Sequence, residues 1–281
     1  MNKHLKNYLD SFKVKKQFWQ IFLIDFIFFS VIGIVYYTFS NYLQNRSFQV
    51  LGGKTSAELQ NLLTTSTPEK LLPFLTELKS FLFFSLVMIL IIVILSFLYF
   101  SYTRALIWNH LENKKLNKKT YWRWNLLNLS LIFPLLSYII VATIITFITS
   151  WLFSKVITIS PTFYVTYQSI MEGVTILLNG IVSFFLVLFF LIILFFTYKS
   201  FTQKYRIWES IGHSFQMIKQ NWSKLWKFLL QAIGTALLLT LIMWPLRTLY
   251  ASNFFFSVTI NMIISLLYLA WFRIYLLKTI E

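Results

Sequence analysis

The sequence predicts an all-α membrane protein: a single-domain bundle of six transmembrane helices. The composition is 58% hydrophobic and 20% aromatic, with only 12% charged residues. A water-soluble chain of 281 residues cannot bury that much apolar surface. Six apolar stretches of about 22–26 residues, or ~33–39 Å of helix, each suffice to cross a hydrocarbon core of ~30 Å. A short basic and aromatic sequence also recurs before alternate stretches.

The six predicted spans are residues 18–40, 80–103, 126–150, 173–198, 225–247 and 253–277. Their apolar residues run continuously and do not alternate with polar ones, which favours helices over strands. The first span is too long for a signal peptide and lacks a cleavage site of small residues. The chain has no cysteine, so disulfides and thiolate metal sites are excluded. Pro134 and Pro245 are candidate kink positions in the third and fifth spans.

The net charge of +16 is distributed unevenly and predicts the orientation. Nineteen basic residues lie in the N-terminal tail, in the second and fourth connections and at the end of the last span. The other six are Arg46, Lys54, Lys70, Lys79, Lys155 and Arg247. Basic residues collect on the cytoplasmic side of membrane proteins. We therefore expect a multi-pass protein of the cell (plasma) membrane with both termini in the cytoplasm.

The recurring sequence divides the chain into three similar units. It reads Lys15-Lys16-Gln17-Phe18-Trp19, then Lys118-Lys119-Thr120-Tyr121-Trp122, then Ile218-Lys219-Gln220-Asn221-Trp222. Its tryptophans lie 103 and 100 residues apart. Self-similarity at a fixed period indicates a repeat architecture. We predict three helix-hairpin repeats, approximately residues 1–104, 105–205 and 206–281.

Each repeat is expected to begin with an amphipathic helix lying in the cytoplasmic membrane interface. In the third repeat, Ile207, Ile211, Phe215 and Ile218 form one apolar stripe. The outer connections differ from one another: residues 41–79 are predicted to form one long loop, and residues 151–172 a shorter one. The long loop is expected to contain two short helices. One begins at a Thr55…Glu58 capping box and the other at Thr67, with Pro68 in its first position.

Lysine and tryptophan within the recurring sequence are candidate lipid contacts. The residues are Lys16, Trp19, Lys119, Trp122, Lys219 and Trp222. One interpretation is an element that binds lipid headgroups or gates a pathway. The other is an aromatic belt with lysines that extend their charge to the interface, as in many membrane proteins.

Asp25 is the most distinctive polar residue in a predicted span. It lies seven positions after Phe18, ~10 Å into the membrane. A carboxylate at that depth is costly and is expected to face protein. Arg104 and Arg273 are its candidate partners. Three interpretations of Asp25 remain open: a proton or cation site, a structural ion pair, or a protonated carboxyl group that is hydrogen-bonded within the bundle.

Four amides form a second set of intramembrane polar candidates: Asn128, Asn179, Gln231 and Asn261. Two interpretations remain open for them. They form separate interhelical hydrogen bonds, or they converge on a polar pathway.

Enzymatic activity is not expected. The three histidines lack spacings suited to a metal ion. Gly52-Gly53-Lys54-Thr55 resembles the end of a phosphate-binding loop, but position 48, where the first glycine belongs, is phenylalanine. No cofactor or metal is therefore predicted. The basic charge is explained by anionic lipid, which excludes nucleic acid as the expected partner.

The segment Glu209–Trp222 resembles an element of a six-helix prokaryotic membrane family. This family includes the membrane domain of glycerophosphodiester phosphodiesterases and its uncharacterised relatives. Its members share a short helix with Ser, an apolar residue and Lys before a span, matched here by Ser214, Met217 and Lys219. The resemblance implies a membrane fold. It implies no activity, because the catalytic domain is absent from this chain.

These observations support two functional hypotheses. The first is a membrane assembly module that binds lipid, or a membrane-protein partner, through its basic, tryptophan-rich cytoplasmic face. The second is a transporter or channel for an ion or small solute that uses Asp25 and the intramembrane amides.

Overall fold

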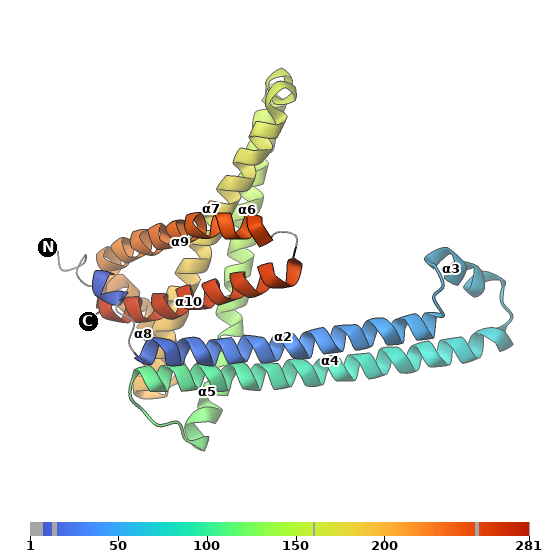
Figure 1. The fold of residues 1–281 in the computed structure, drawn as a ribbon, viewed down its shortest axis with the longest axis horizontal. Coiled ribbons are helices and arrows are strands. Elements are labelled where there is room, and N and C mark those ends of the chain that lie inside the picture. The colour runs from blue at the N-terminus through green and yellow to red at the C-terminus, as the bar shows by residue number, and fades with distance from the viewer. Residues whose placement is uncertain (1–7, 13–15, 160, 251–252, 281) are drawn as a thin grey trace. The chain divides into compact units, whose positions relative to one another are not determined.

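The computed structural model describes residues 8–12, 16–159, 161–250 and 253–280, and among these it contains helices and no strand. After a helical turn at residues 8–11, the helices are α2 (Lys16–Leu51), α3 (Ser56–Thr65), α4 (Pro68–Leu111), α5 (Lys118–Ser130), α6 (Ile132–Ile159), α7 (Pro161–Lys204), α8 (Ile207–Gln220), α9 (Trp222–Tyr250) and α10 (Phe254–Ile280). Within the described residues, six segments are long and apolar enough to cross a membrane (Figure 1). The chain is therefore an all-α, multi-pass membrane protein, as predicted.

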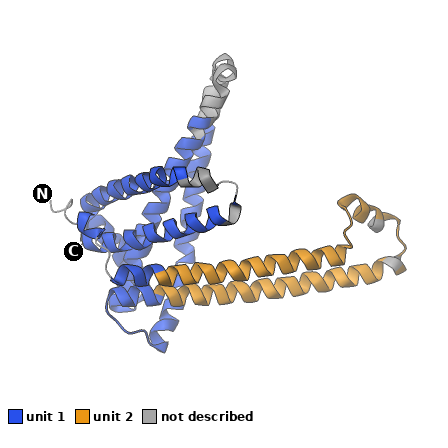
Figure 2. Ribbon diagram, in the orientation of Figure 1, with its two compact units in different colours: residues 1–22, 105–281 blue, residues 23–104 orange. Residues whose placement is uncertain are grey.

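The chain divides into two compact units, shown in different colours in Figure 2. Unit 1 comprises Met1–Phe22 and Ala105–Glu281, and unit 2 comprises Leu23–Arg104. The boundary therefore falls inside α2 and inside α4. This division separates most of the first predicted hairpin as unit 2. The single domain predicted from the sequence stays a prediction. The threefold repeat stays a prediction.

Unit 2 is a hairpin in which α2 and α4 run antiparallel, side by side (Figure 2). Aromatic rings hold the two helices together: the Phe28 centroid lies 5.3 Å from that of Tyr99. Outward-facing side chains such as Ile34 and Leu86 are exposed. Apolar side chains in these positions suit contact with lipid. The backbone groups suit it too, because each is hydrogen-bonded within its own helix.

The region predicted as the long loop 41–79 is mostly helical, which corrects that prediction. α2 passes through Gly33 and continues to Leu51, because no further glycine and no proline occurs before Gly52 and Gly53. There φ values of 62° and 67° place both glycines in the left-handed region. The Gly53 N–H donates to Phe48 O and the Gly52 N–H to Gln49 O, the Schellman pattern that ends a helix.

The two helix starts predicted in this region have different outcomes. α3 begins after the expected capping box: the Thr55 N–H donates to Glu58 Oε2 at 2.7 Å and the Glu58 N–H to Thr55 Oγ1 at 3.3 Å. Pro68 does occupy the first position of a helix, but that helix is the long α4 and not a separate short one. Residues 151–172 also differ from prediction, because α6 and α7 extend into them.

The α3 cap is expected to weaken in acid. Hydrogen bonds from the Thr55 backbone and hydroxyl lower the Glu58 pKa below its usual 4.5. The contribution of this cap is therefore fully present above the unfolded-state pKa and is lost as pH falls through the lower folded-state value. The protection factors for amide hydrogen exchange in the first turn of α3, which correct for the pH dependence of the intrinsic exchange rate, should fall over that range. Glu58→Gln is the matched control, because glutamine makes the same cap without titrating. An equal fall of the protection factors in both proteins would contradict the assignment.

Unit 1 contains two further helix pairs, α6 with α7 and α9 with α10, and the short helices α5 and α8 (Figure 1). Its buried side chains gather at one end of the long helices, around the end of α7, the start of α9 and the end of α10. The largest completely buried ones include Trp108, Trp124, Tyr198, Phe228 and Phe272. Both tryptophan rings lie against Tyr198, at centroid distances of 5.9 and 5.4 Å.

The third predicted span is made by two consecutive helices. α5 starts at a complete capping box in which the Thr120 N–H donates to Asn117 Oδ1 at 2.9 Å. The helix ends at Ser130, and α6 starts at Ile132 with Pro134 in its first turn, where proline is tolerated. The break between α5 and α6 therefore lies at Leu131, three residues before the predicted kink at Pro134.

α8 is the short helix expected before the fifth span, and it buries one face against protein while part of the predicted apolar stripe stays exposed. Ser210, Ser214 and Ile218 are buried, whereas Phe215 is exposed. α8 packs against α7, and small side chains allow helices to approach closely. The position of the apolar stripe in the membrane interface stays a prediction.

Candidate functional site

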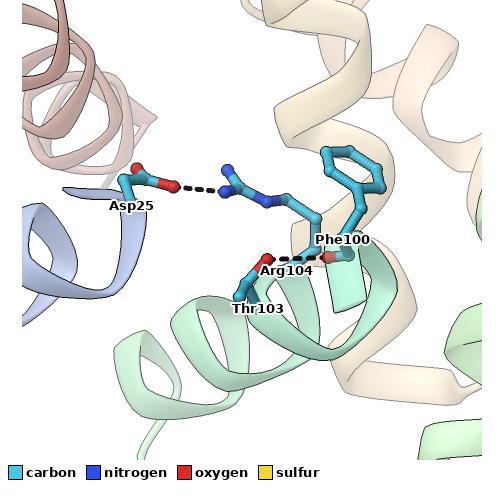
Figure 3. Close-up of polar contacts among 4 residues, drawn as sticks. All are labelled: Asp25, Phe100, Thr103 and Arg104. Carbon is cyan, nitrogen blue, oxygen red and sulfur yellow. Dashed lines mark hydrogen bonds and ion pairs between the residues drawn. The ribbon is translucent and has the colours of Figure 1, made fainter. Parts of the chain in front are cut away.

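Asp25 and Arg104 form a buried ion pair inside unit 2. The guanidinium of Arg104 donates to the carboxylate of Asp25, which has no exposed surface (Figure 3). The same guanidinium lies over two aromatic rings, 5.8 Å from the Phe28 centroid and 5.2 Å from that of Phe100. The neighbouring Thr103 hydroxyl donates to the Phe100 carbonyl. One of the two predicted partners of Asp25 is thus observed.

Arg273, the other candidate partner, is buried in unit 1 on α10. Its guanidinium lies 5.2 Å from the centroid of Phe195 on α7. A cation above a ring face is stabilised by the ring quadrupole, most strongly where water is excluded. The contact joins the ends of two spanning helices within the aromatic core.

Three of the four predicted amides bond across different pairs of helices. The Tyr198 hydroxyl on α7 donates to Asn128 Oδ1 on α5 at 2.7 Å. The Thr149 hydroxyl on α6 donates to Asn179 Oδ1 on α7 at 2.7 Å. On α9, Gln231 accepts from the hydroxyl of Tyr275 on α10. Asn261 is half-buried on α10. These bonds join separate helix pairs, which is the arrangement expected of interhelical hydrogen bonds.

The lysines and tryptophans of the recurring sequence form three pairs, all in unit 1. The pairs are Lys16 with Trp19, Lys119 with Trp122, and Lys219 with Trp222. We call them the Lys–Trp pairs. In each pair the tryptophan follows the lysine by three residues, and all three lysines are exposed. The tryptophans are 50%, 55% and 52% exposed, so each is half in contact with protein and half available to its surroundings.

A groove of about 310 Å³ opens beside the first Lys–Trp pair. We call it the N-terminal groove; its walls include Phe12, Trp19, Thr235, Leu239, Leu267 and Trp271. The groove exists because the N-terminal turn docks on α10, where the Phe12 and Trp271 rings stack at 5.3 Å. Trp271 Nε1–H also donates to Ser11 Oγ at 2.9 Å. Lys278 Nζ donates to the Asp10 carbonyl at 2.8 Å.

A second cavity, of about 570 Å³, lies between α2 and α4 in unit 2. It is lined almost entirely by apolar side chains, among them Val35, Phe39 and Met88. Asp25 lines neither cavity.

The ends of α4 and α7 form a polar junction that sequence reasoning missed. Lys114 Nζ donates to the Thr202 carbonyl at 2.5 Å, and the Tyr205 hydroxyl to Asn109 Oδ1 at 2.8 Å. Burial raises the pKa of the Tyr205 phenol. Asn113 and Tyr205 each have a φ of 52° at these helix ends. The polar turn sequence after Leu111 could have indicated the left-handed conformation of Asn113. No sequence pattern indicates the left-handed conformation of Tyr205.

Metal chemistry receives no support from the part of the chain that the structure describes, where no group of three or more His, Asp or Glu residues could hold an ion. Comparison with protein-family models, curated proteins and solved structures finds no match. The resemblance noted in the sequence therefore stays a prediction, and function is argued from the residues alone.

Proposed function

We propose that the protein is a membrane module that binds anionic phospholipid through its Lys–Trp pairs. The observation that carries this proposal is the repetition of one arrangement, an exposed lysine followed three residues later by a half-exposed tryptophan, at three places in unit 1. No enzymatic activity is part of the proposal.

The chemistry of each pair suits the headgroup layer. An indole ring has an apolar body and one N–H donor, so it is favoured at the boundary between acyl chains and water. The lysine three residues earlier carries a compact positive charge with three donors, which suits a phosphate. In the first two pairs both residues lie in one helix, whereas Lys219 belongs to α8 and Trp222 begins α9. Each basic residue near an anionic leaflet contributes ~1 kcal/mol of attraction. Three pairs therefore give a substantial preference for anionic over zwitterionic lipid.

The orientation required by this proposal follows from charge. Nineteen of the 25 basic residues belong to the side that we predict to be cytoplasmic, and all three Lys–Trp pairs are on that side. The proposal accordingly places both termini in the cytoplasm and the pairs at the inner leaflet of the plasma membrane.

The transport hypothesis has less support. It depends on an Asp25 that accepts ions and on amides that converge. The Asp25 carboxylate is instead bonded to Arg104, and the amide bonds lie between separate helix pairs.

The test is lipid enrichment in polymer-extracted discs from membranes of equal phosphatidylglycerol and phosphatidylcholine. We expect discs around the wild-type protein to be enriched in phosphatidylglycerol, and the combined Lys16→Gln, Lys119→Gln and Lys219→Gln variant to lose most of that enrichment. The matched control is Lys115→Gln, Lys204→Gln and Lys227→Gln, which removes the same charge from exposed lysines with no tryptophan three residues later. If both triple variants lose the same phosphatidylglycerol enrichment, net charge alone explains the enrichment, and the role of the Lys–Trp pairs is contradicted.

A further inference from the structure

The N-terminal groove lies beside a Lys–Trp pair and has the dimensions of a ligand site. Its volume of about 310 Å³ is at the lower end of the range for small-molecule sites. Three parts of unit 1 form it: the N-terminal turn, the start of α2, and the facing sides of α9 and α10. Sequence reasoning did not find it, because these segments are far apart along the chain.

The polar atoms that line the groove are already bonded to protein. Trp271 Nε1–H donates to Ser11 Oγ, and the Ser11 hydroxyl donates to the Tyr8 carbonyl. The Tyr8 and Thr235 hydroxyls lie 2.9 Å apart and share a hydrogen bond. The Tyr268 hydroxyl donates to the Ala232 carbonyl at 3.0 Å. A polar ligand would find few partners here and would lose its own hydration. The lining therefore suits an apolar chain.

A positive charge lies one helical turn before a residue of the groove wall. Lys16 and Trp19 are three residues apart in α2, so they lie on the same face of the helix. Trp19 lines the groove, and Lys16 is exposed one turn before it. An ammonium at that position can meet the phosphate of a molecule whose apolar chain lies between Trp19 and Leu239.

We infer that the N-terminal groove holds one acyl chain of an anionic phospholipid, whose phosphate is bound by Lys16. This deepens the proposed function and rests on it for the choice of headgroup. It adds a stoichiometric, long-lived site to the more general attraction of the Lys–Trp pairs. Phospholipid is favoured over free fatty acid because the surroundings of the spanning helices are phospholipid.

Filling the groove tests the acyl-chain site. Leu239→Trp places a larger side chain in the groove wall, while Leu238→Trp makes the same change at an exposed neighbour that does not line it. Each displaced methylene weakens binding about fourfold, so the loss of two or more lowers retention by more than about tenfold. Native mass spectrometry of protein purified from phosphatidylglycerol and phosphatidylcholine membranes counts retained lipids after detergent washing. If Leu239→Trp does not fold, Leu267→Phe on the opposite wall replaces it.

We expect the wild type and Leu238→Trp to retain one phosphatidylglycerol per chain and Leu239→Trp to lose it. Equal retention in both tryptophan variants overturns the groove assignment. Retention of fatty acid in place of phospholipid overturns the choice of ligand. Lys16→Gln should abolish the preference for phosphatidylglycerol at this site, whereas Lys119→Gln should leave it. A retained lipid with no headgroup preference in the wild type contradicts the role of Lys16.

Failure of this inference and failure of the proposed function give different results. Without the groove site, the discs remain enriched in phosphatidylglycerol, but no retained lipid is lost specifically in Leu239→Trp. Without the function of the Lys–Trp pairs, the disc enrichment itself is missing, whatever the groove retains.

Discussion

Replacing Asp25 by asparagine is expected to lower the free energy of unfolding by about 3–5 kcal/mol, because the buried guanidinium of Arg104 would lose its counter-charge. The cost of an uncompensated buried cation exceeds the value of the ion pair itself. Thermal unfolding of the purified protein in detergent measures the change.

The matched control for Asp25→Asn is Glu77→Gln in the same hairpin. Glu77 lies 3.6 Å from Arg46, but both side chains are about half exposed, and exposed pairs contribute at most ~1 kcal/mol. The double variant Asp25→Leu with Arg104→Met should recover much of the lost stability, since apolar residues of similar volume often replace a buried pair without loss. If Asp25→Asn proves as stable as Glu77→Gln and abolishes an ion or solute flux, Asp25 is a transport residue and our account of it is wrong.

Trp124→Ala is expected to lower the free energy of unfolding by about 3–5 kcal/mol, which is usual when a large aromatic side chain is removed from a core. Trp124 is completely buried and contacts Tyr198 and Phe201, at centroid distances of 5.4 and 5.0 Å. Its loss would loosen the contact between α5 and α7.

Trp122 provides the matched control two residues earlier in the same helix. It is 55% exposed, so Trp122→Ala should leave the unfolding temperature almost unchanged while reducing lipid enrichment. The two variants thus separate a core role from an interfacial one. If Trp122→Ala and Trp124→Ala unfold at similar temperatures, Trp124 is not a residue of the buried aromatic core.

The spans and the main polar pair could be predicted from sequence because each depends on a strong local signal. A long apolar run has few alternatives to a membrane helix. Depth alone made Arg104 and Arg273 the candidate partners of Asp25, since an intramembrane carboxylate needs a partner at a similar level. The choice of Arg104 depends on the tertiary fold. The Thr55…Glu58 box was equally predictable, because both of its hydrogen bonds lie within four residues.

The N-terminal groove could not be predicted, because Ser11 and Trp271 come together only through the tertiary fold. Nor could periodicity identify which tryptophan of α5 is buried. Trp122 and Trp124 lie on nearly opposite faces of a helix, yet the recurring sequence drew attention only to the first.

The most direct test of the central claim is the ratio of phosphatidylglycerol to phosphatidylcholine in discs that contain the wild-type protein, compared with protein-free discs from the same membrane. Our account predicts a clearly higher ratio around the protein. A ratio equal to that of the bulk membrane would contradict anionic lipid binding by the Lys–Trp pairs.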